Sequence, residues 1–170
     1  DVDTGSDDSV AIAAAVLSRD IDLLGITVIH GNLPLVNTLD NTLRVVEFLG
    51  KDVPVYGGCS EPMVMNLLPG SVLNTPRRRP GGMVDGKERS IHEKALPLPA
   101  PTIQARPEHA CTWIVETLKK SQDRVTLIPV GPMTNIAMAI RMDPSIVEKI
   151  EEIIPMGGGA FMSNYTIAAE

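Results

Sequence analysis

The chain opens on an acidic motif, Asp1-Val2-Asp3-Thr4-Gly5-Ser6-Asp7-Asp8, which places four carboxylates around one glycine. Carboxylates held this close repel one another, and their pKa values rise unless a cation or hydrogen-bond donors compensate them. A hard divalent ion with oxygen ligands would provide that compensation. An alanine-rich apolar run follows directly, so the N–H groups at the start of a helix can stabilise some of the same charges. The motif therefore predicts a cation-binding loop at the beginning of a helix.

The composition predicts a single globular domain over residues 1–170. Hydrophobic residues make up 44% of the chain and charged residues 21%, which is enough apolar material for a core. The net charge of -6 argues against a nucleic-acid partner. No apolar stretch approaches the roughly 20 residues that span a bilayer, so no membrane partner is expected.

Cys59 and Cys111 are far apart in the sequence and lack a CxxC spacing. The sequence therefore suggests neither a zinc site nor a disulfide framework, and we expect two free thiols. Free thiols are typical of a reducing compartment, so the expected location is cytoplasmic.

Helical and strand-like segments alternate along the chain. Apolar periodicity predicts helices over 7–18, 35–49, 107–120, 134–141 and 144–150, and strands over 21–30, 53–56, 124–130 and 153–156. Residues 57 to about 106 show no sustained period and form an irregular excursion, which is typical of a lid or a mobile segment. Strands separated by helices imply right-handed crossovers. The expected fold is an α/β, Rossmann-like open sheet, mainly parallel, with helices on both faces.

Ligands of such sheets bind beyond the carboxyl ends of the strands. The residues at those ends are Asn32, the backbone around Val130 and the glycine run 157–159. We therefore expect one edge of the sheet to gather these residues.

Five segments of the chain together resemble the calcium-dependent nucleoside hydrolases, the inosine–uridine-preferring N-ribohydrolases. They are the acidic motif, residues 25–32 (Gly-Ile-Thr-Val-Ile-His-Gly-Asn), residues 53–58, residues 127–137, and residues 154–159 leading to Asn164 and Ala169-Glu170. The resemblance implies hydrolysis of the N-glycosidic bond of ribonucleosides to ribose and free base, with a calcium-positioned water, in purine or pyrimidine salvage. It also implies a homo-oligomer, a dimer or a tetramer.

The resemblance also implies individual roles. Asp3, Asp8 and the backbone carbonyl of Val130 would bind calcium, and Asp3 would act as general base toward the water that it shares with the metal. Asp1 would orient the loop by hydrogen bonding. The ribose hydroxyls would be held by Asp7, Asn32, Asn164 and Glu170.

The sequence departs from the family pattern at both ends. The family has a strand before the motif, and it continues beyond the Ala-Glu pair to a distant His-Asp that supplies a leaving-group contact and a further calcium carboxylate. We therefore expect a partial chain, incomplete at both ends, which has little or no activity alone.

The sequence also predicts the surroundings of the three histidines and of one methionine. We expect His30 to be packed and hydrogen-bonded, His109 to lie on the surface, and His92 to be solvent-exposed in its loop rather than catalytic. Met156 is expected as core filler or as a substrate contact.

Two other functions compete with the hydrolase. One is a non-catalytic ribose or nucleoside binding module, or an inactive partial protein that keeps the metal loop. The other is a magnesium-dependent phosphohydrolase of the haloacid dehalogenase type with Asp1 as nucleophile, although the acidic pair Asp7-Asp8 is not expected there. An EF-hand is excluded because Gly5 and Ile12 stand where its loop requires ligands. Purine and pyrimidine substrates are not distinguished.

Overall fold

The computed structural model describes residues 1–63, 81–84, 87–90 and 92–158. The helices are α1 (Ser6–Leu17), α2 (Leu35–Phe48), α4 (Ala110–Lys120), α5 (Thr134–Met142) and the 3-10 helix η2 (Pro144–Lys149). The strands are β1 (Ile26–Val28), β2 (Val55–Gly57), β3 (Gly81–Val84), β4 (Lys87–Ser90), β5 (Val125–Leu127) and β6 (Ile150–Ile153). Among the described residues, no helix is both long enough and apolar enough to cross a membrane.

The acidic motif runs through the middle of the sheet. β1 pairs with β2 and β5 pairs with β6, both in parallel. Val2 forms a parallel bridge with Val28 of β1. On the other side, the main-chain nitrogen of Asp1 donates to Ile128 O at 2.9 Å, and Val130 N donates to Asp1 O at 2.9 Å. The first residues therefore link the two strand pairs in the order β2-β1-(1–3)-β5-β6, which confirms the predicted open, mainly parallel sheet.

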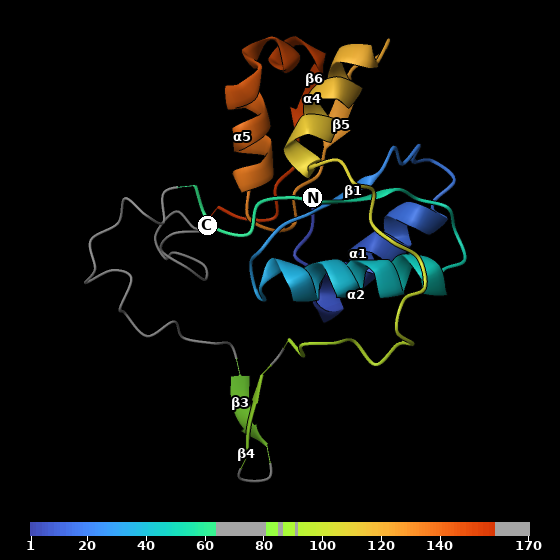
Figure 1. The fold of residues 1–170 in the computed structure, drawn as a ribbon, viewed down its shortest axis with the longest axis vertical. Helices are drawn as coiled ribbons and strands as arrows, with labels where there is room; N and C mark the ends of the chain where they lie inside the picture. Colours follow the sequence, from blue (N-terminus) through green and yellow to red (C-terminus); the bar gives the residue numbers. More distant parts are fainter. Residues whose placement is uncertain (64–80, 85–86, 91, 159–170) are drawn as a thin grey trace, which may run out of the picture.

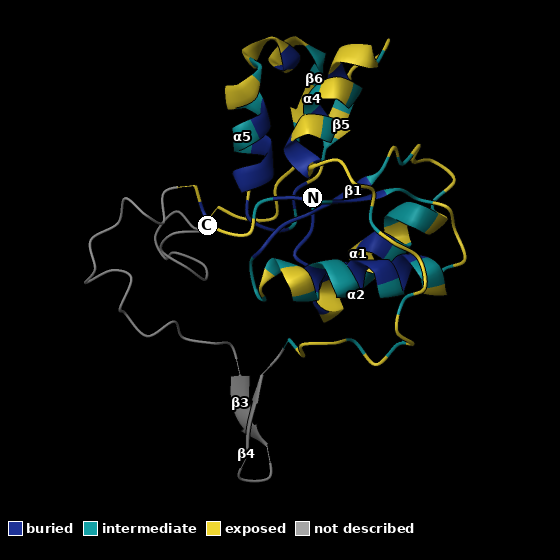
Figure 2. Ribbon diagram, in the orientation of Figure 1, coloured by how far each residue is buried: buried dark blue, intermediate teal, exposed yellow. Residues whose placement is uncertain are grey.

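Helices cover both faces of this sheet, as predicted (Figure 1). On one face, α1 and α2 enclose a core built around Ile12, Val28 and Val46. On the other face, α4 and α5 enclose a second core built around Ile114, Leu118 and Ile136. The buried sides of all four helices turn toward the strands (Figure 2). The two cores hold the sheet from both sides and fix its carboxyl edge.

Several predicted elements differ from the observed ones. β3 and β4 form an antiparallel pair inside the excursion that the sequence predicted to be irregular. The first strand covers only 26–28, because Ile21 and Leu24 are exposed rather than buried in the sheet. Residues 144–149 form a 3-10 helix rather than an α-helix, with Asp143 Oδ1 accepting from Ser145 N at 3.1 Å at its start. The last strand begins at Ile150, three residues earlier than predicted, because Ile150 and Ile153 pack against the second core.

Candidate functional site at the carboxyl edge of the sheet

Asp3 lies just beyond the bridge between Val2 and β1, at the carboxyl edge of the sheet. Its side chain is buried, with 3% of the residue exposed. Asn32 N donates to Asp3 Oδ2 at 2.7 Å. A Cβ atom at Gly31 would overlap the Asp3 carboxylate, and one at Gly131 would lie 2.9 Å from Asp3 Oδ1. The loops after β1 and β5 therefore close around Asp3, which brings the backbone of Asn32 and the backbone next to Val130 close to its carboxylate.

Asp8 stands in the first turn of α1 and is equally buried, with 4% of the residue exposed. Its Oδ1 accepts from Asp3 N at 3.3 Å, so the two acids are directly linked. Burial and, second, the nearby charge of Asp7 raise the pKa of the Asp8 carboxyl, while the Asp3 N–H opposes the rise. Asp8 is therefore a buried acid whose ionised form gains from a nearby cation.

A polar stripe on α2 positions the motif loop. Thr38, Asn41 and Thr42 follow one another at helical spacing and are fully buried. Asn41 Nδ2 donates to Thr4 O at 3.1 Å, and the hydroxyls of Thr42 and Thr4 are 2.7 Å apart. These bonds hold the loop that carries Asp3 and Asp8 against the first core. The apolar periodicity of the helix does not predict this stripe, because its members are polar.

Asn135, in the first turn of α5, is fully buried and connects three segments. Its Nδ2 donates to Asp1 Oδ1 at 2.9 Å and to Val28 O at 3.2 Å, and its Oδ1 accepts from Cys59 N at 2.8 Å. Asp1 Oδ2 is also buried, and it has no hydrogen-bond partner among the described residues. The amide thus ties the motif strand to β1 and to the loop after β2, a role that the sequence analysis did not assign.

The remaining predicted site residues lie in different surroundings. Asp7 faces outward, with 64% of its side chain exposed, and its Oδ1 is 3.7 Å from His92 Nδ1. Asn164, Glu170 and Gly159 lie outside the described residues, so the structure places only Asp3, Asp7, Asp8, Asn32 and Val130 of the predicted site.

The prediction that His92 is solvent-exposed is wrong. Only 10% of its side chain is exposed, because the ring packs on the motif loop, where a Cβ atom at Gly5 would overlap it. His30 is packed as predicted, with Nδ1 3.2 Å from Cys59 O, and His109 is exposed. Met156 is not core filler, since 51% of it is exposed.

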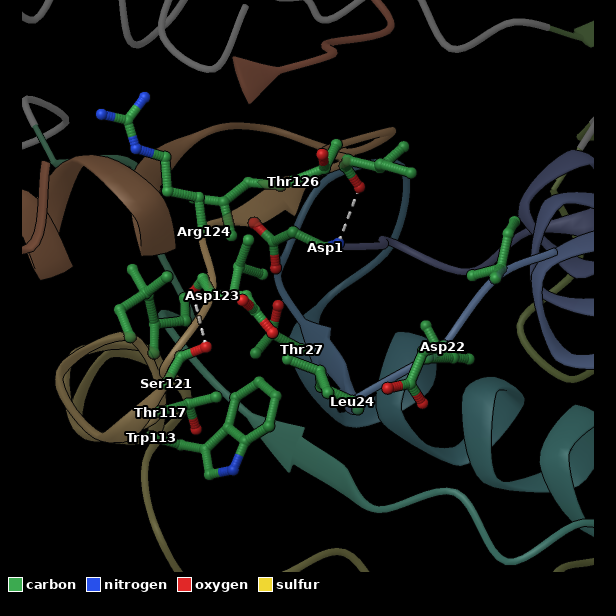
Figure 3. A pocket seen from close by; sticks show the side chains of 18 of the residues that line it. Asp1, Asp22, Leu24, Thr27, Trp113, Thr117, Ser121, Asp123, Arg124 and Thr126 are labelled. Atoms are coloured by element: carbon green, nitrogen blue, oxygen red, sulfur yellow. Dashed lines mark hydrogen bonds between the residues drawn. The ribbon is translucent and has the colours of Figure 1, made fainter. Parts of the chain in front are cut away.

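A cavity of about 550 Å³ opens at the opposite edge of the sheet (Figure 3). Its walls come from the residues before β1, from α4 and from β5, and they include Asp22, Trp113 and Arg124. Asp1 contributes to it, but Asp3 and Asp8 do not. Because ligands of open parallel sheets bind at the carboxyl edge, the acidic pair rather than this cavity defines the candidate site.

Comparisons with known proteins identify the family of the chain. The family model described as inosine-uridine preferring nucleoside hydrolase matches residues 1–170. The pyrimidine-specific ribonucleoside hydrolase RihB of Escherichia coli (strain SE11) is 40% identical over 170 residues, which are 100% of this chain and 50% of the relative. The chain therefore spans about half the length of the curated relatives that it matches.

Solved structures show the same fold. A purine-preferring ribonucleoside hydrolase from Gardnerella vaginalis superposes with a TM-score of 0.70 at 28% identity, covering 93% of this chain and 47% of the other. An inosine-guanosine nucleoside hydrolase superposes with a TM-score of 0.76 at 23% identity, covering 99% of this chain and 52% of the other.

Proposed function

Because this chain belongs to the inosine-uridine preferring nucleoside hydrolase family, we propose that the protein hydrolyses the N-glycosidic bond of ribonucleosides to ribose and free base. The observation that carries the proposal is the linked pair of buried carboxylates, Asp3 and Asp8, at the carboxyl edge of the sheet. Cleavage of this bond builds positive charge on the sugar in an oxocarbenium-like transition state. A buried anionic pair at the ligand-binding edge favours that charge.

We further propose that the acidic pair holds calcium. The donors present are the oxygens that a hard cation prefers, because Asp3 and Asp8 are both buried and Asp8 Oδ1 lies 3.3 Å from Asp3 N. The raised pKa of Asp8 and the unpartnered Asp1 Oδ2 indicate negative charge that the described residues do not fully compensate. Asp3, Asp8 and the Val130 carbonyl would hold the ion, which when bound orients the attacking water and the ribose hydroxyls.

Individual residues of the chain would then have separate roles in the reaction. Asp3 would accept the proton of the attacking water. Asn32 holds Asp3 through its main-chain N–H. Asp7, Asn32, Asn164 and Glu170 would hold the ribose hydroxyls and thereby reduce the orientational entropy of the reaction. Asp1, fixed by Asn135, would keep the loop in position.

The proposed substrates are pyrimidine ribonucleosides, in a salvage role. Support comes from the 40% identity to proteins named pyrimidine-specific ribonucleoside hydrolases, in Escherichia coli and in Shigella sonnei. The homo-oligomer, a dimer or a tetramer, stays a prediction of the family resemblance, and light scattering tests it. The cytoplasmic location stays a prediction from the two free thiols, and cell fractionation tests it.

The function is tested by incubating the protein with uridine, cytidine, inosine and guanosine and measuring reducing sugar with calcium or with a chelator. We expect calcium-dependent release of ribose, fastest from uridine or cytidine, in a form as long as the relatives, and little turnover by residues 1–170 alone. Magnesium-dependent release of phosphate from a phosphate ester would instead support the phosphohydrolase. Thermal stabilisation by ribose without turnover in the longer form would support a binding module.

A methyl group at Gly31 is expected to disturb the site. In Gly31→Ala the new Cβ overlaps the Asp3 carboxylate, so the side chain must move away from Asn32 N. Changes next to a metal ligand typically weaken metal binding by about 10–100-fold, and we expect a loss of calcium affinity in that range by titration calorimetry. Gly57→Ala is the matched control, because its Cβ would meet only Leu39 Cδ2, at 3.4 Å. Equal calcium affinity in both variants would contradict the assigned position of the ion.

A further inference from the structure

Two cysteines and a histidine that are distant in the sequence come together behind the motif strand. Cys59 follows β2, while His109 caps α4 and Cys111 lies in its first turn. The two Sγ atoms are 3.8 Å apart, and one ligand atom from each of the three residues lies within 4.8 Å of the others. Both cysteines are free thiols. The fold thus assembles a soft donor set that the sequence spacing did not reveal.

The separation of the two sulfurs matches that in a tetrahedral metal site. Zinc binds thiolate sulfur at about 2.3 Å, so two sulfurs on one tetrahedral ion are about 3.8 Å apart. The Sγ atoms of Cys59 and Cys111 already have this separation. We propose that Cys59, His109 and Cys111 bind a thiophilic divalent ion, zinc by preference, with a solvent molecule as fourth ligand. This inference does not depend on the proposed hydrolase activity.

The two thiols must lose their protons to bind the ion. The contact between the two sulfurs lowers the pKa of the Cys59 thiol, while the same contact and burial raise that of Cys111. The ion binds the thiolate form of Cys59, whose proton is released to solvent. Cys111 then releases its proton to solvent when the ion replaces the shared hydrogen.

His109 would have to give up its hydrogen bond at the start of α4, or change its protonated ring nitrogen, to bind the ion. Its Nδ1 accepts from Cys111 N at 3.3 Å, which is a long hydrogen bond. Coordination through Nδ1 would break that weak cap, and coordination through Nε2 would require the Nδ1 atom to carry the proton.

The ion would strengthen a connection that Asn135 already makes. Asn135 Oδ1 accepts from Cys59 N at 2.8 Å and lies 3.8 Å from Cys111 Sγ. A metal held by both cysteines would fasten the loop after β2 to the start of α4, next to the amide that holds Asp1. Soft sulfur and nitrogen ligands select zinc, whereas the oxygens of Asp3 and Asp8 select a hard ion. The two metals would therefore occupy separate places.

Cobalt(II) titration of the reduced protein, with calcium in excess to saturate the acidic loop, tests the proposal. We expect one equivalent of cobalt to produce thiolate charge-transfer and tetrahedral d–d absorption bands, which one equivalent of zinc abolishes. Cys59→Ser and Cys111→Ser should each remove the charge-transfer band. His109→Asn keeps a side-chain oxygen that can cap α4 but lacks the imidazole, and it should weaken cobalt binding at least about tenfold, as loss of a metal ligand does.

Asp52→Asn, a change at an exposed acid after α2, is the control and should leave the cobalt spectrum unchanged. Circular dichroism of each variant verifies folding, and Cys59→Ser, at a half-exposed position, keeps the test decisive if Cys111→Ser unfolds. Absence of a thiolate band in the reduced native protein would overturn the proposal. So would a reduced protein that binds no cobalt yet forms a Cys59–Cys111 disulfide with oxidised glutathione, because the cysteines would then be a redox pair.

Discussion

Replacement of Asp3 by asparagine is expected to abolish nucleoside hydrolysis with little change in folding. The amide oxygen can still accept from Asn32 N, so the packing of the loop is kept. The negative charge and the proton acceptor are lost. A positioned general base contributes about 10²–10⁴-fold to a rate, and we expect kcat/KM to fall by at least this factor in a form of the protein that turns over uridine. In the 170-residue chain, calcium binding measured by calorimetry should disappear.

Asp52→Asn is the matched control for this experiment, because it removes the same charge from an exposed position. It should change neither kcat/KM nor calcium affinity. Thermal unfolding of both variants separates a damaged site from a damaged fold. Normal turnover by Asp3→Asn would contradict the assignment of Asp3 as the general base. Unchanged calcium affinity of the same variant would contradict its assignment as a calcium ligand.

Replacement of Asn135 by alanine is expected to have the largest effect on stability. The change removes the acceptor of Cys59 N and the donor to Asp1 Oδ1, and the structure buries both of these bonds at least in part. A buried polar group left without a partner costs about 1–3 kcal/mol, so the loss of these two bonds should lower the free energy of unfolding by about 2–6 kcal/mol. Chemical denaturation monitored by circular dichroism measures this loss.

Asn37→Ala tests whether the effect is specific to the buried amide. Asn37 lies on α2 and makes one exposed hydrogen bond, from Nδ2 to Lys94 O at 3.2 Å. A surface change of this kind usually alters stability by no more than about 0.5 kcal/mol. Similar losses for the two variants would show that Asn135 does not connect the segments as described.

The sequence by itself determined the order of elements, the parallel sheet and the edge at which the acids gather. These features depend on local signals: apolar periodicity, the glycines after the strands and the acids at the start of a helix. Asp3 and Asn32 meet as expected, since both follow neighbouring parallel strands and such strands end at the same edge. The predicted carboxyl ends of the parallel strands lie within three residues of the observed ones, and in this sheet that is enough to place both residues at the same edge.

Only the tertiary structure decided which residues meet when they come from distant segments that show no common apolar periodicity. The polar stripe of α2 and the amide of Asn135 point inward only because a partner from a distant segment satisfies each of them. Cys59 and Cys111 were predicted as separate free thiols, yet the packing of α4 beside the end of β2 brings their sulfurs to 3.8 Å. Sequence spacing cannot report such a distance, because it depends on how two elements pack rather than on either element alone.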